Sequence, residues 1–205
     1  MSEVAVIDAG GANFGSVCYA LERLGATPRL VRDADGLCGM PRVILPGVGA
    51  AAPAMRLLHG RGFVEALRGI AVPLLGICLG MQLLFEASEE GEVDCLGLLP
   101  GRVSKLQGGP GLRVPHMGWN TLQHIAPDHA AKSPLLQGID DGASAYFVHG
   151  YAAPVTGDCI AACTHGARFA AMVQRGHVVG AQFHPERSAA TGARLLANFL
   201  RWAPA

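Results

Sequence analysis

One cysteine stands in a setting that suits a nucleophile. Residues 76–80 read Gly-Ile-Cys-Leu-Gly, a G-x-C-x-G pattern directly after an apolar run. This is the cysteine counterpart of the nucleophile elbow, in which a sharp strand-to-helix turn lifts the side chain above a sheet. Glycines beside such a turn avoid Cβ clashes, and the positive end of the following helix favours a thiolate on Cys78. Taken alone, the motif fits a buried structural cysteine equally well.

A histidine and a glutamate follow another apolar run, at His184-Pro185-Glu186. Proline disfavours the helical region for the residue before it, so His184 is expected to be extended. In an extended chain, residues two apart project to the same side, so Glu186 can reach the imidazole of His184 and orient it. His184 could then accept the proton of a thiol and return it to a leaving group. A solvated strand end explains this pair slightly better on its own. The catalytic interpretation is favoured once both residues are considered, because Cys78 also follows a strand and ligands bind at the carboxyl ends of parallel strands.

A third strand end carries Pro-Gly-Val-Gly at residues 46–49. Its glycines would allow a backbone N–H of Gly47 or Val48 to join that of Leu79 in an oxyanion hole. An ordinary Pro-Gly turn is the alternative. Gln82, four residues after the cysteine, would share its helix face and could hold a polar substrate group. The other candidate substrate contacts come from residue 49 and the strand 146–151: Gly49, Phe147, Val148, His149 and Gly150.

The elements expected around these residues alternate in the first half of the chain. Strands are predicted at residues 3–8, 27–32, 42–45 and 72–77, with helices between them and another helix from Leu79 to Ser88. Such apolar strands indicate a parallel sheet buried on both faces. The second half predicts strands at 96–106, 119–125, 143–149, 159–165, 167–175 and 178–183, then a helix at 189–202. A single α/β domain over residues 1–205 is expected.

Composition excludes several classes of protein. Half of the 205 residues are hydrophobic and 16% are charged, and the formal net charge is zero, so a nucleic-acid footprint is not supported. No secretory signal is expected, because the first residues lack a basic region followed by an apolar run, and the six cysteines suggest reduced thiols in the cytoplasm. The uncharged stretch between Arg68 and Glu86 is broken by glycine and proline, so a buried strand and helix explain it better than a membrane span.

Together the segments resemble the triad glutamine amidotransferases, a family with a flavodoxin-like α/β fold: an open, mostly parallel sheet with helices on both faces, here with extra antiparallel strands. The motifs that carry the resemblance are PGVG at 46–49, GICLGMQ at 76–82 and QFHPERS at 182–188. It implies that Cys78 is the nucleophile, His184 the general base and acid, and Glu186 its orienter. The substrate would be L-glutamine, and no cofactor is implied.

Within that family the likeness is greatest to the glutaminase subunits of imidazole glycerol phosphate synthase, through PGVG, VPHMGWN at 114–120 and YFVHGY at 146–151. The resemblance implies a heterodimer with a (β/α)8-barrel cyclase. Ammonia would be channelled to the cyclase, which would make imidazole glycerol phosphate and an aminoimidazole carboxamide ribotide in histidine biosynthesis. The chain departs from the family pattern at residues 9–14, near the expected partner contact, at Ala51, where phenylalanine or a similar residue is usual, and at Gly150, which lacks the usual hydroxyl.

Three alternatives compete with this interpretation. Another glutaminase could serve anthranilate, aminodeoxychorismate or pyridoxal phosphate synthesis, although VPHMGWN and PGVG speak against it. A non-catalytic binding module of the same fold would be expected to lack the thiol or the imidazole. Finally, Cys159, Cys163 and His165 have the even spacing that would place them on one strand face as metal ligands, but no fourth ligand is evident, so no metal is expected.

Overall fold

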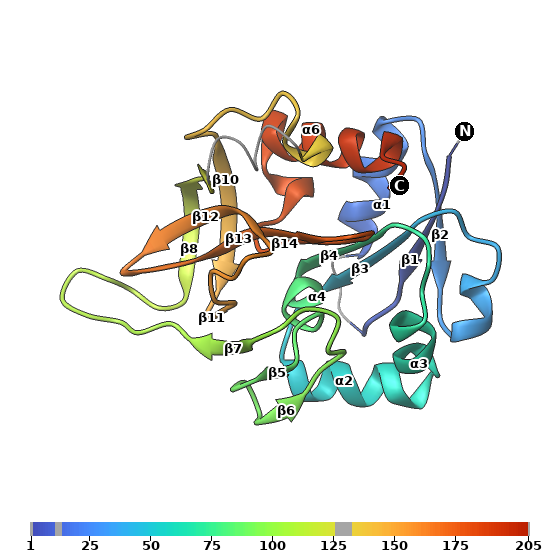
Figure 1. Ribbon diagram of the computed structural model, residues 1–205, viewed down its shortest axis with the longest axis horizontal. Helices are drawn as coiled ribbons and strands as arrows, with labels where there is room; N and C mark the ends of the chain where they lie inside the picture. Colours follow the sequence, from blue (N-terminus) through green and yellow to red (C-terminus); the bar gives the residue numbers. More distant parts are fainter. Residues whose placement is uncertain (1, 11–13, 126–132, 205) are drawn as a thin grey trace.

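An eight-stranded sheet runs through the computed structural model, which describes residues 2–10, 14–125 and 133–204 (Figure 1). The strand order is β2-β1-β3-β4-β14-β13-β12-β9. The first five strands are parallel and the last three are added antiparallel, so the predicted fold class is confirmed. The strands are β1 (Glu3–Ile7), β2 (Thr27–Val31), β3 (Val43–Gly47), β4 (Leu74–Cys78), β9 (Gln123–His124), β12 (Cys159–His165), β13 (Ala167–Arg175) and β14 (Val178–Ala181).

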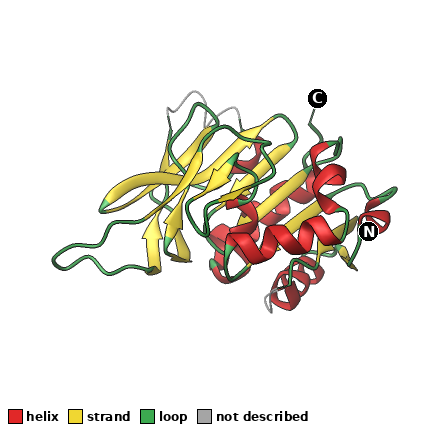
Figure 2. Cartoon of the chain, turned by 90° about the horizontal axis from the view of Figure 1, so that it is seen from below, coloured by secondary structure: helices red, strands yellow, loops and turns green. Residues whose placement is uncertain are grey.

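Helices cover both faces of the parallel half (Figures 1 and 2). Successive side chains of a strand point to opposite faces, so Val4 and Val6 of β1 join one core cluster and Ala5 and Ile7 join the other. Each cluster is closed by a different pair of helices, which explains why the inner strands β3, β4 and β14 are buried along their whole length. The pairs are α1 (Phe14–Arg23) with α6 (Ala189–Arg201), and α2 (Ala51–Gly60) with α3 (Phe63–Arg68).

Two smaller sheets lie beside the main one. Strand β10 (Ser144–His149) pairs antiparallel with β8 (His116–Thr121). The other sheet has the order β11-β7-β5-β6, with β5 (Ala87–Ser88), β6 (Val93–Asp94), β7 (Arg102–Lys105) and β11 (Tyr151–Ala152). Short helical turns complete the described elements: η1 (Ala34–Leu37), α4 (Leu79–Gln82), η2 (Pro134–Leu136) and η3 (Pro185–Arg187).

The helix predicted from Leu79 to Ser88 is wrong in length, because α4 ends at Gln82. The carbonyl groups of the next three residues, Leu83, Leu84 and Phe85, accept hydrogen bonds from backbone N–H groups of residues 96–99. These carbonyls are therefore not available to continue a helix. The contact with a later loop is tertiary, so the local pattern could not reveal it.

Other predicted elements were too long for similar reasons. The strand expected at 119–125 is divided, because the chain leaves its pairing with β10 at Leu122 and then pairs with β12 as β9. The strand expected at 96–106 contracts to β7. The helical stretch expected up to residue 68 breaks at Gly62, which adopts φ 73° between α2 and α3.

The predicted shared face of Cys159 and Cys163 is also wrong. The register of β12 against β13 shifts on both sides of Ala161, as in a β-bulge, so the alternation of side chains is interrupted there. Cys159 consequently packs in the cluster with α2 and α3, and Cys163 in the cluster with α1 and α6. Within residues 2–10, 14–125 and 133–204, no group of three metal-binding side chains comes together.

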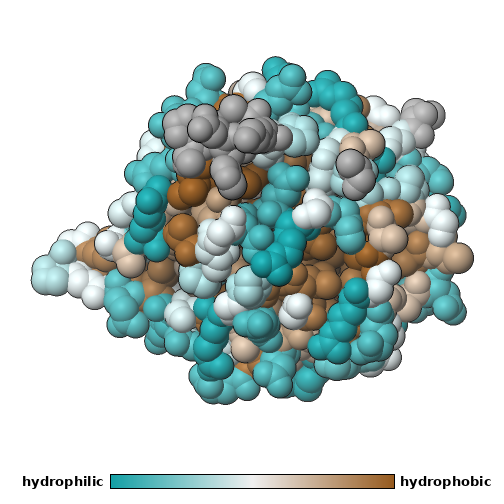
Figure 3. Space-filling model, in the orientation of Figure 1, coloured by the Kyte–Doolittle hydropathy of each residue, from teal (hydrophilic) through white to brown (hydrophobic). Residues whose placement is uncertain are grey.

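The surface seen in Figure 3 has hydrophobic residues gathered across its middle and hydrophilic residues along its upper and lower rims. Among the residues that the structure describes, no helix has both the length and the apolar character needed to cross a bilayer. The stretch between Arg68 and Glu86 is instead the buried strand β4 and the turn α4.

We expect Gly192→Ala to destabilise the protein, because this glycine of α6 packs directly on η3. A Cβ at Gly192 would lie 1.8 Å from the carbonyl oxygen of Pro185. The free energy of unfolding should fall by about 1–3 kcal/mol in urea titrations, despite the better helix propensity of alanine. Gly60→Ala, at a helical glycine whose Cβ would meet nothing within 4 Å, is the matched control. Equal stability of both variants would contradict this packing.

Candidate active site

Three strand ends meet where the chemistry was predicted. Strand β4 lies between β3 and β14, and all three run parallel. Gly47 is in register with Cys78, and Ala181 is in register with Ile77. The residues that follow β4 and β14 therefore emerge side by side at one edge of the sheet, which brings the cysteine and the His-Pro-Glu segment together.

Cys78 lies on a strained turn between β4 and α4. Its φ of 54° and ψ of −113° fall in a region that side-chain-bearing residues rarely adopt. The turn is tight: a Cβ on Gly76 would lie 2.7 Å from the carbonyl oxygen of Gly80, and one on Gly80 would lie 1.8 Å from that of Leu45. The flanking glycines thus have the steric role that the sequence predicted for them.

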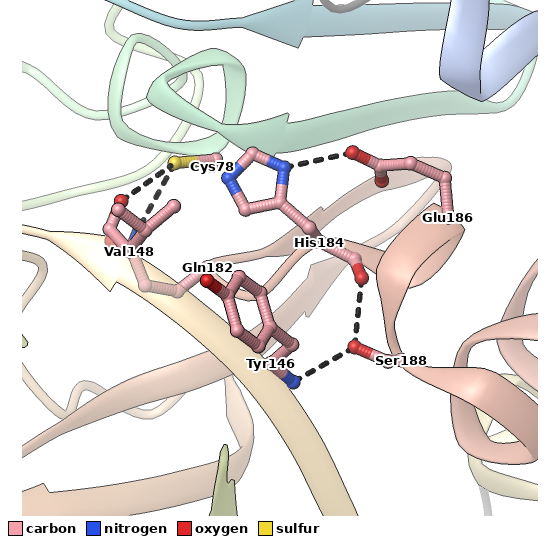
Figure 4. Close-up of polar contacts among 7 residues, drawn as sticks. All are labelled: Cys78, Tyr146, Val148, Gln182, His184, Glu186 and Ser188. Atoms are coloured by element: carbon pink, nitrogen blue, oxygen red, sulfur yellow. Dashed lines mark hydrogen bonds and ion pairs between the residues drawn. The ribbon is translucent and has the colours of Figure 1, made fainter. Parts of the chain in front are cut away.

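His184 lies between the thiol and a carboxylate (Figure 4). Its backbone is extended, with φ −96° and ψ 100°, as the following proline predicted. Its Nδ1 is 2.9 Å from Oε1 of Glu186, so Nδ1–H donates to the carboxylate, and the two side chains are only 3% and 0% exposed. This pairing leaves Nε2 for the side of the ring that faces Cys78.

The surroundings of His184 favour its charged form. Burial alone would lower the pKa of the imidazole, but the hydrogen bonds and charges of Cys78 and Glu186 together outweigh burial and raise its pKa to about 10. An imidazole with this balance can take the thiol proton and hold it beside a thiolate.

A serine that the sequence interpretation missed holds the histidine segment against β10. The Ser188 hydroxyl donates to the carbonyl of His184 at 2.7 Å and accepts from the N–H of Tyr146 at 2.9 Å. The N–H of His184 in turn donates to the carbonyl of Tyr146 at 3.0 Å. Only the position of Ser188 after His-Pro-Glu-Arg could have indicated this clasp.

A cavity of about 350 Å³ opens above the sulfur of Cys78. All but three of the predicted site residues line it, the exceptions being Glu186, Gly47 and Phe147. Glu186 lies behind the imidazole, and Gly47 packs against the start of α4. Phe147 is fully buried and stacks on His116 with ring centroids 4.9 Å apart. The predicted residues that line the cavity are Val48, Gly49, Cys78, Leu79, Gln82, Val148, His149, Gly150 and His184.

The cavity also has lining residues that were not predicted as site residues: Glu90, Tyr151 and Arg187. Glu90 comes from the turn between β5 and β6, and its Oε2 accepts from the N–H of Ala51 at the start of α2. Tyr151 and Arg187 belong to the YFVHGY and QFHPERS segments, whereas Glu90 belongs to no quoted motif, so only the folded chain could place it in the cavity. Of the departures from the family pattern, Gly150 lines the cavity and Ala51 is buried at the start of α2, whereas residues 11–13 lie outside the described residues.

His149 is engaged inside the protein through both ring nitrogens. Its Nδ1 is 2.8 Å from the carbonyl oxygen of Tyr151, so this nitrogen carries the proton, and its Nε2 accepts from Nδ1 of His116 at 3.1 Å. Nε2 of His116 accepts from the amide of Asn120 at 3.2 Å, and its ring stacks on His165 at 4.1 Å. The hydrogen bonds therefore hold His116 and His149 as neutral tautomers.

Burial is the main reason that these two rings stay neutral. It lowers the pKa of His149 to about 3 and that of His116 to about 4, and the neighbouring histidines reinforce both shifts. In the folded chain the two rings therefore bind fewer protons than in the unfolded chain as pH falls below 6.5. The two rings therefore reduce the free energy of unfolding progressively from pH 6.5 down to about pH 3.

The fold and this set of groups define a class of protein. The family model described as glutamine amidotransferase class-I matches residues 5–202, and the chain belongs to that family. Curated relatives specify the group within it. The chain is 65% identical over 200 residues to the imidazole glycerol phosphate synthase subunit HisH of Xanthomonas axonopodis pv. citri, and 63% identical to that of Xylella fastidiosa (strain Temecula1), with 98% of each chain covered.

Solved structures show the same fold at lower sequence identity. A structure described as a glutamine amidotransferase aligns over 96% of both chains with a TM-score of 0.74 and 23% identity. A chain of the PurLQS structure from Thermotoga maritima aligns over 97% of both chains, with a TM-score of 0.70 and 23% identity. These likenesses support the architecture alone.

We expect His116→Phe to make the free energy of unfolding depend less steeply on pH below pH 6.5. With one buried neutral histidine removed, the slope of the free energy of unfolding against pH should fall by up to about 1.4 kcal/mol per pH unit between pH 4 and 6.5. This is the slope that a difference of one bound proton between the folded and unfolded chain produces. Urea titrations at a series of pH values measure this slope. His59→Phe, at an exposed histidine, should leave it unchanged, and an unaltered slope in the His116 variant would refute the assignment.

Proposed function

We infer that the chain hydrolyses L-glutamine to glutamate and ammonia, with Cys78 as nucleophile, His184 as general base and acid, and Glu186 as its orienter. The observation that carries this proposal is the buried imidazole between a carboxylate 2.9 Å away and the thiol of the elbow. Membership of the class-I glutamine amidotransferase family supplies the reaction class. The proposed unit is one glutaminase domain spanning residues 1–205.

The proposed reaction proceeds in two halves. His184 takes the proton of Cys78, and the thiolate attacks the side-chain amide carbon of glutamine to form a tetrahedral oxyanion. His184 returns the proton to the nitrogen as the C–N bond breaks, which releases ammonia and leaves a thioester. Water, deprotonated by His184, then attacks the thioester, and glutamate leaves as the sulfur regains its proton. The sum is glutamine plus water giving glutamate plus ammonia.

Backbone donors would stabilise the oxyanion. The N–H of Leu79 starts α4 directly beside the nucleophile, and Gly47 or Val48 would provide a second donor from the adjacent strand end. The substrate is a zwitterion with an ammonium and a carboxylate. Among the described lining residues, the carboxylate of Glu90 and the guanidinium of Arg187 have the complementary charges.

The proposed partner is a (β/α)8-barrel cyclase that receives the ammonia and makes imidazole glycerol phosphate and an aminoimidazole carboxamide ribotide, in the cytoplasm, for histidine biosynthesis. The names of the relatives, subunits of imidazole glycerol phosphate synthase, support it. So does the surface beside the cavity. On β8, Met117 is 65% exposed and Trp119 is 56% exposed, and Met117 pairs in register with Val148, which lines the cavity. Exposed large apolar groups of this kind mark protein interfaces.

We expect Cys78→Ser to abolish glutamine-dependent synthesis in the complex with the cyclase, with at least a ~1,000-fold loss, of the order seen when other enzyme nucleophiles are removed. Synthesis from added ammonium salt should continue at the unmodified rate, because the thiol serves the hydrolysis alone. Glutamate release and product formation are measured side by side. Cys38→Ser, at an exposed cysteine, is the control. Full glutamine-dependent activity in the Cys78 variant would disprove the nucleophile.

We expect Trp119→Ala to weaken binding of the cyclase by roughly 30-fold, since an exposed tryptophan at an interface commonly contributes about 2 kcal/mol. Titration calorimetry or a labelled cyclase would measure the dissociation constant. Leu30→Ala is the control, because Leu30 is exposed on β2, the strand at the opposite edge of the main sheet. Equal affinities of the two variants would place the interface elsewhere.

A further inference from the structure

Two buried side-chain amides lie behind the sulfur of Cys78. Nε2 of Gln182, a residue with no exposed surface, is 3.7 Å from the sulfur. Its Oε1 is 2.9 Å from Nε2 of Gln82, and that same nitrogen is 2.8 Å from the carbonyl oxygen of Tyr151. Amides are costly to bury unless they are hydrogen-bonded, and these three contacts form one continuous chain that ends at the nucleophile.

The carbonyl of Tyr151 fixes which way each of the two amide groups is turned. A carbonyl oxygen can only accept, so the Gln82 atom beside Tyr151 must be the amide nitrogen. The same nitrogen donates its second hydrogen to Gln182, so the Gln182 atom that it meets must be the oxygen. The remaining end of the Gln182 amide is therefore its N–H group, and it faces the sulfur.

Another contact of the sulfur has the opposite preference. The carbonyl oxygen of Val148 is 3.9 Å from the Cys78 sulfur, and because it is an acceptor it favours the protonated thiol (Figure 4). The amide of Gln182 is a donor and favours the thiolate. The sheet holds it there: β14 ends at Ala181, in register with Ile77, so the next residue of each strand places Gln182 beside Cys78.

We propose that Gln182 is a further catalytic residue, which donates an amide N–H to the thiolate of Cys78, and that Gln82 is a positioning residue that keeps this donor aimed at the sulfur. The proposal deepens the proposed function and rests on it. His184 supplies the charge that balances the thiolate, and Gln182 supplies a neutral donor from within the sheet. Because the thiolate is the nucleophile, the donor raises the fraction of protein ready to attack.

The assignment also changes the role of Gln82. Both hydrogens of its amide are used within the protein, by Tyr151 and Gln182, so it has no amide hydrogen left to donate to a substrate. These two hydrogen bonds do not use its oxygen, and Gln82 lines the cavity. A substrate contact through that oxygen is compatible with the positioning role.

The test follows the reactivity of the thiol against pH. In Gln182→Leu, the pH midpoint for alkylation of Cys78 by iodoacetamide, read on its own peptide by mass spectrometry, should rise by roughly one pH unit or more, the scale of a hydrogen bond to a charged group. Glutamine hydrolysis in the complex should fall about 10-fold near neutral pH, mainly in kcat, and recover part of the loss at higher pH. Gln82→Leu should give a smaller shift in the same direction.

Matched variants separate this role from packing. Gln174→Leu removes another amide of the same sheet, which bonds Ser133 and not the nucleophile, and should keep the unmodified midpoint. Gln182→Glu retains the shape and the acceptor for Gln82 but turns an oxygen toward the sulfur, so its midpoint should rise further than that of the leucine variant. Should Gln182→Leu fail to fold, as thermal unfolding would reveal, the glutamate variant alone decides.

An unmodified alkylation midpoint in a folded Gln182 variant overturns the proposal. The alkylation needs no turnover, so this outcome is distinct from failure of the proposed function. Failure of the proposed function would instead appear as full glutamine hydrolysis by the Cys78→Ser variant, and this result does not depend on the alkylation measurement.

Discussion

The close approach of two backbone segments is the constraint on which the site depends. The turn after β4 presses so tightly on β3 that Gly80 has no room for a side chain beside the carbonyl of Leu45. This contact lets the chain turn sharply at Cys78 and holds the residue at a φ of 54°. A less tight turn would move the sulfur away from the imidazole that emerges from β14. The strain is local, and the surrounding parallel sheet, buried on both faces, maintains it.

The second feature that the site depends on is the pairing of charged groups that are buried away from water. Glu186 and His184 are almost fully buried, where an isolated charge would be costly, yet each has a partner within the same small cluster. The pKa of His184 rises because its partners outweigh burial, whereas the pKa of His149, which is bonded to a carbonyl and a second imidazole, falls. Two histidines that line the same cavity thus take opposite protonation states, and only the one beside Cys78 is suited to carry a proton.

The thiol is surrounded by elements from all parts of the chain. The elbow comes from β4, the imidazole from the end of β14, and the carbonyl of Val148 from β10, which also pairs with the exposed surface on β8. Ser188 ties the histidine segment to β10. A partner bound on β8 would therefore lie one strand away from the groups that touch the sulfur. The proposed docking surface and the proposed active site are therefore joined through the pairing of β8 with β10.

The alternation of strands and helices, the glycine-flanked elbow and the extended His-Pro-Glu segment could all be predicted from the amino-acid sequence, because these features depend on local steric rules and on hydrophobic periodicity. The sequence could not reveal that the helix after Cys78 stops at Gln82, that a bulge in β12 separates Cys159 from Cys163, or that Phe147 lies in the core. Nor could it show that Gln182 faces the sulfur, since that orientation depends on a carbonyl at Tyr151. Such features were decided by tertiary structure alone, because each depends on a hydrogen-bond partner or strand neighbour that is distant in the chain.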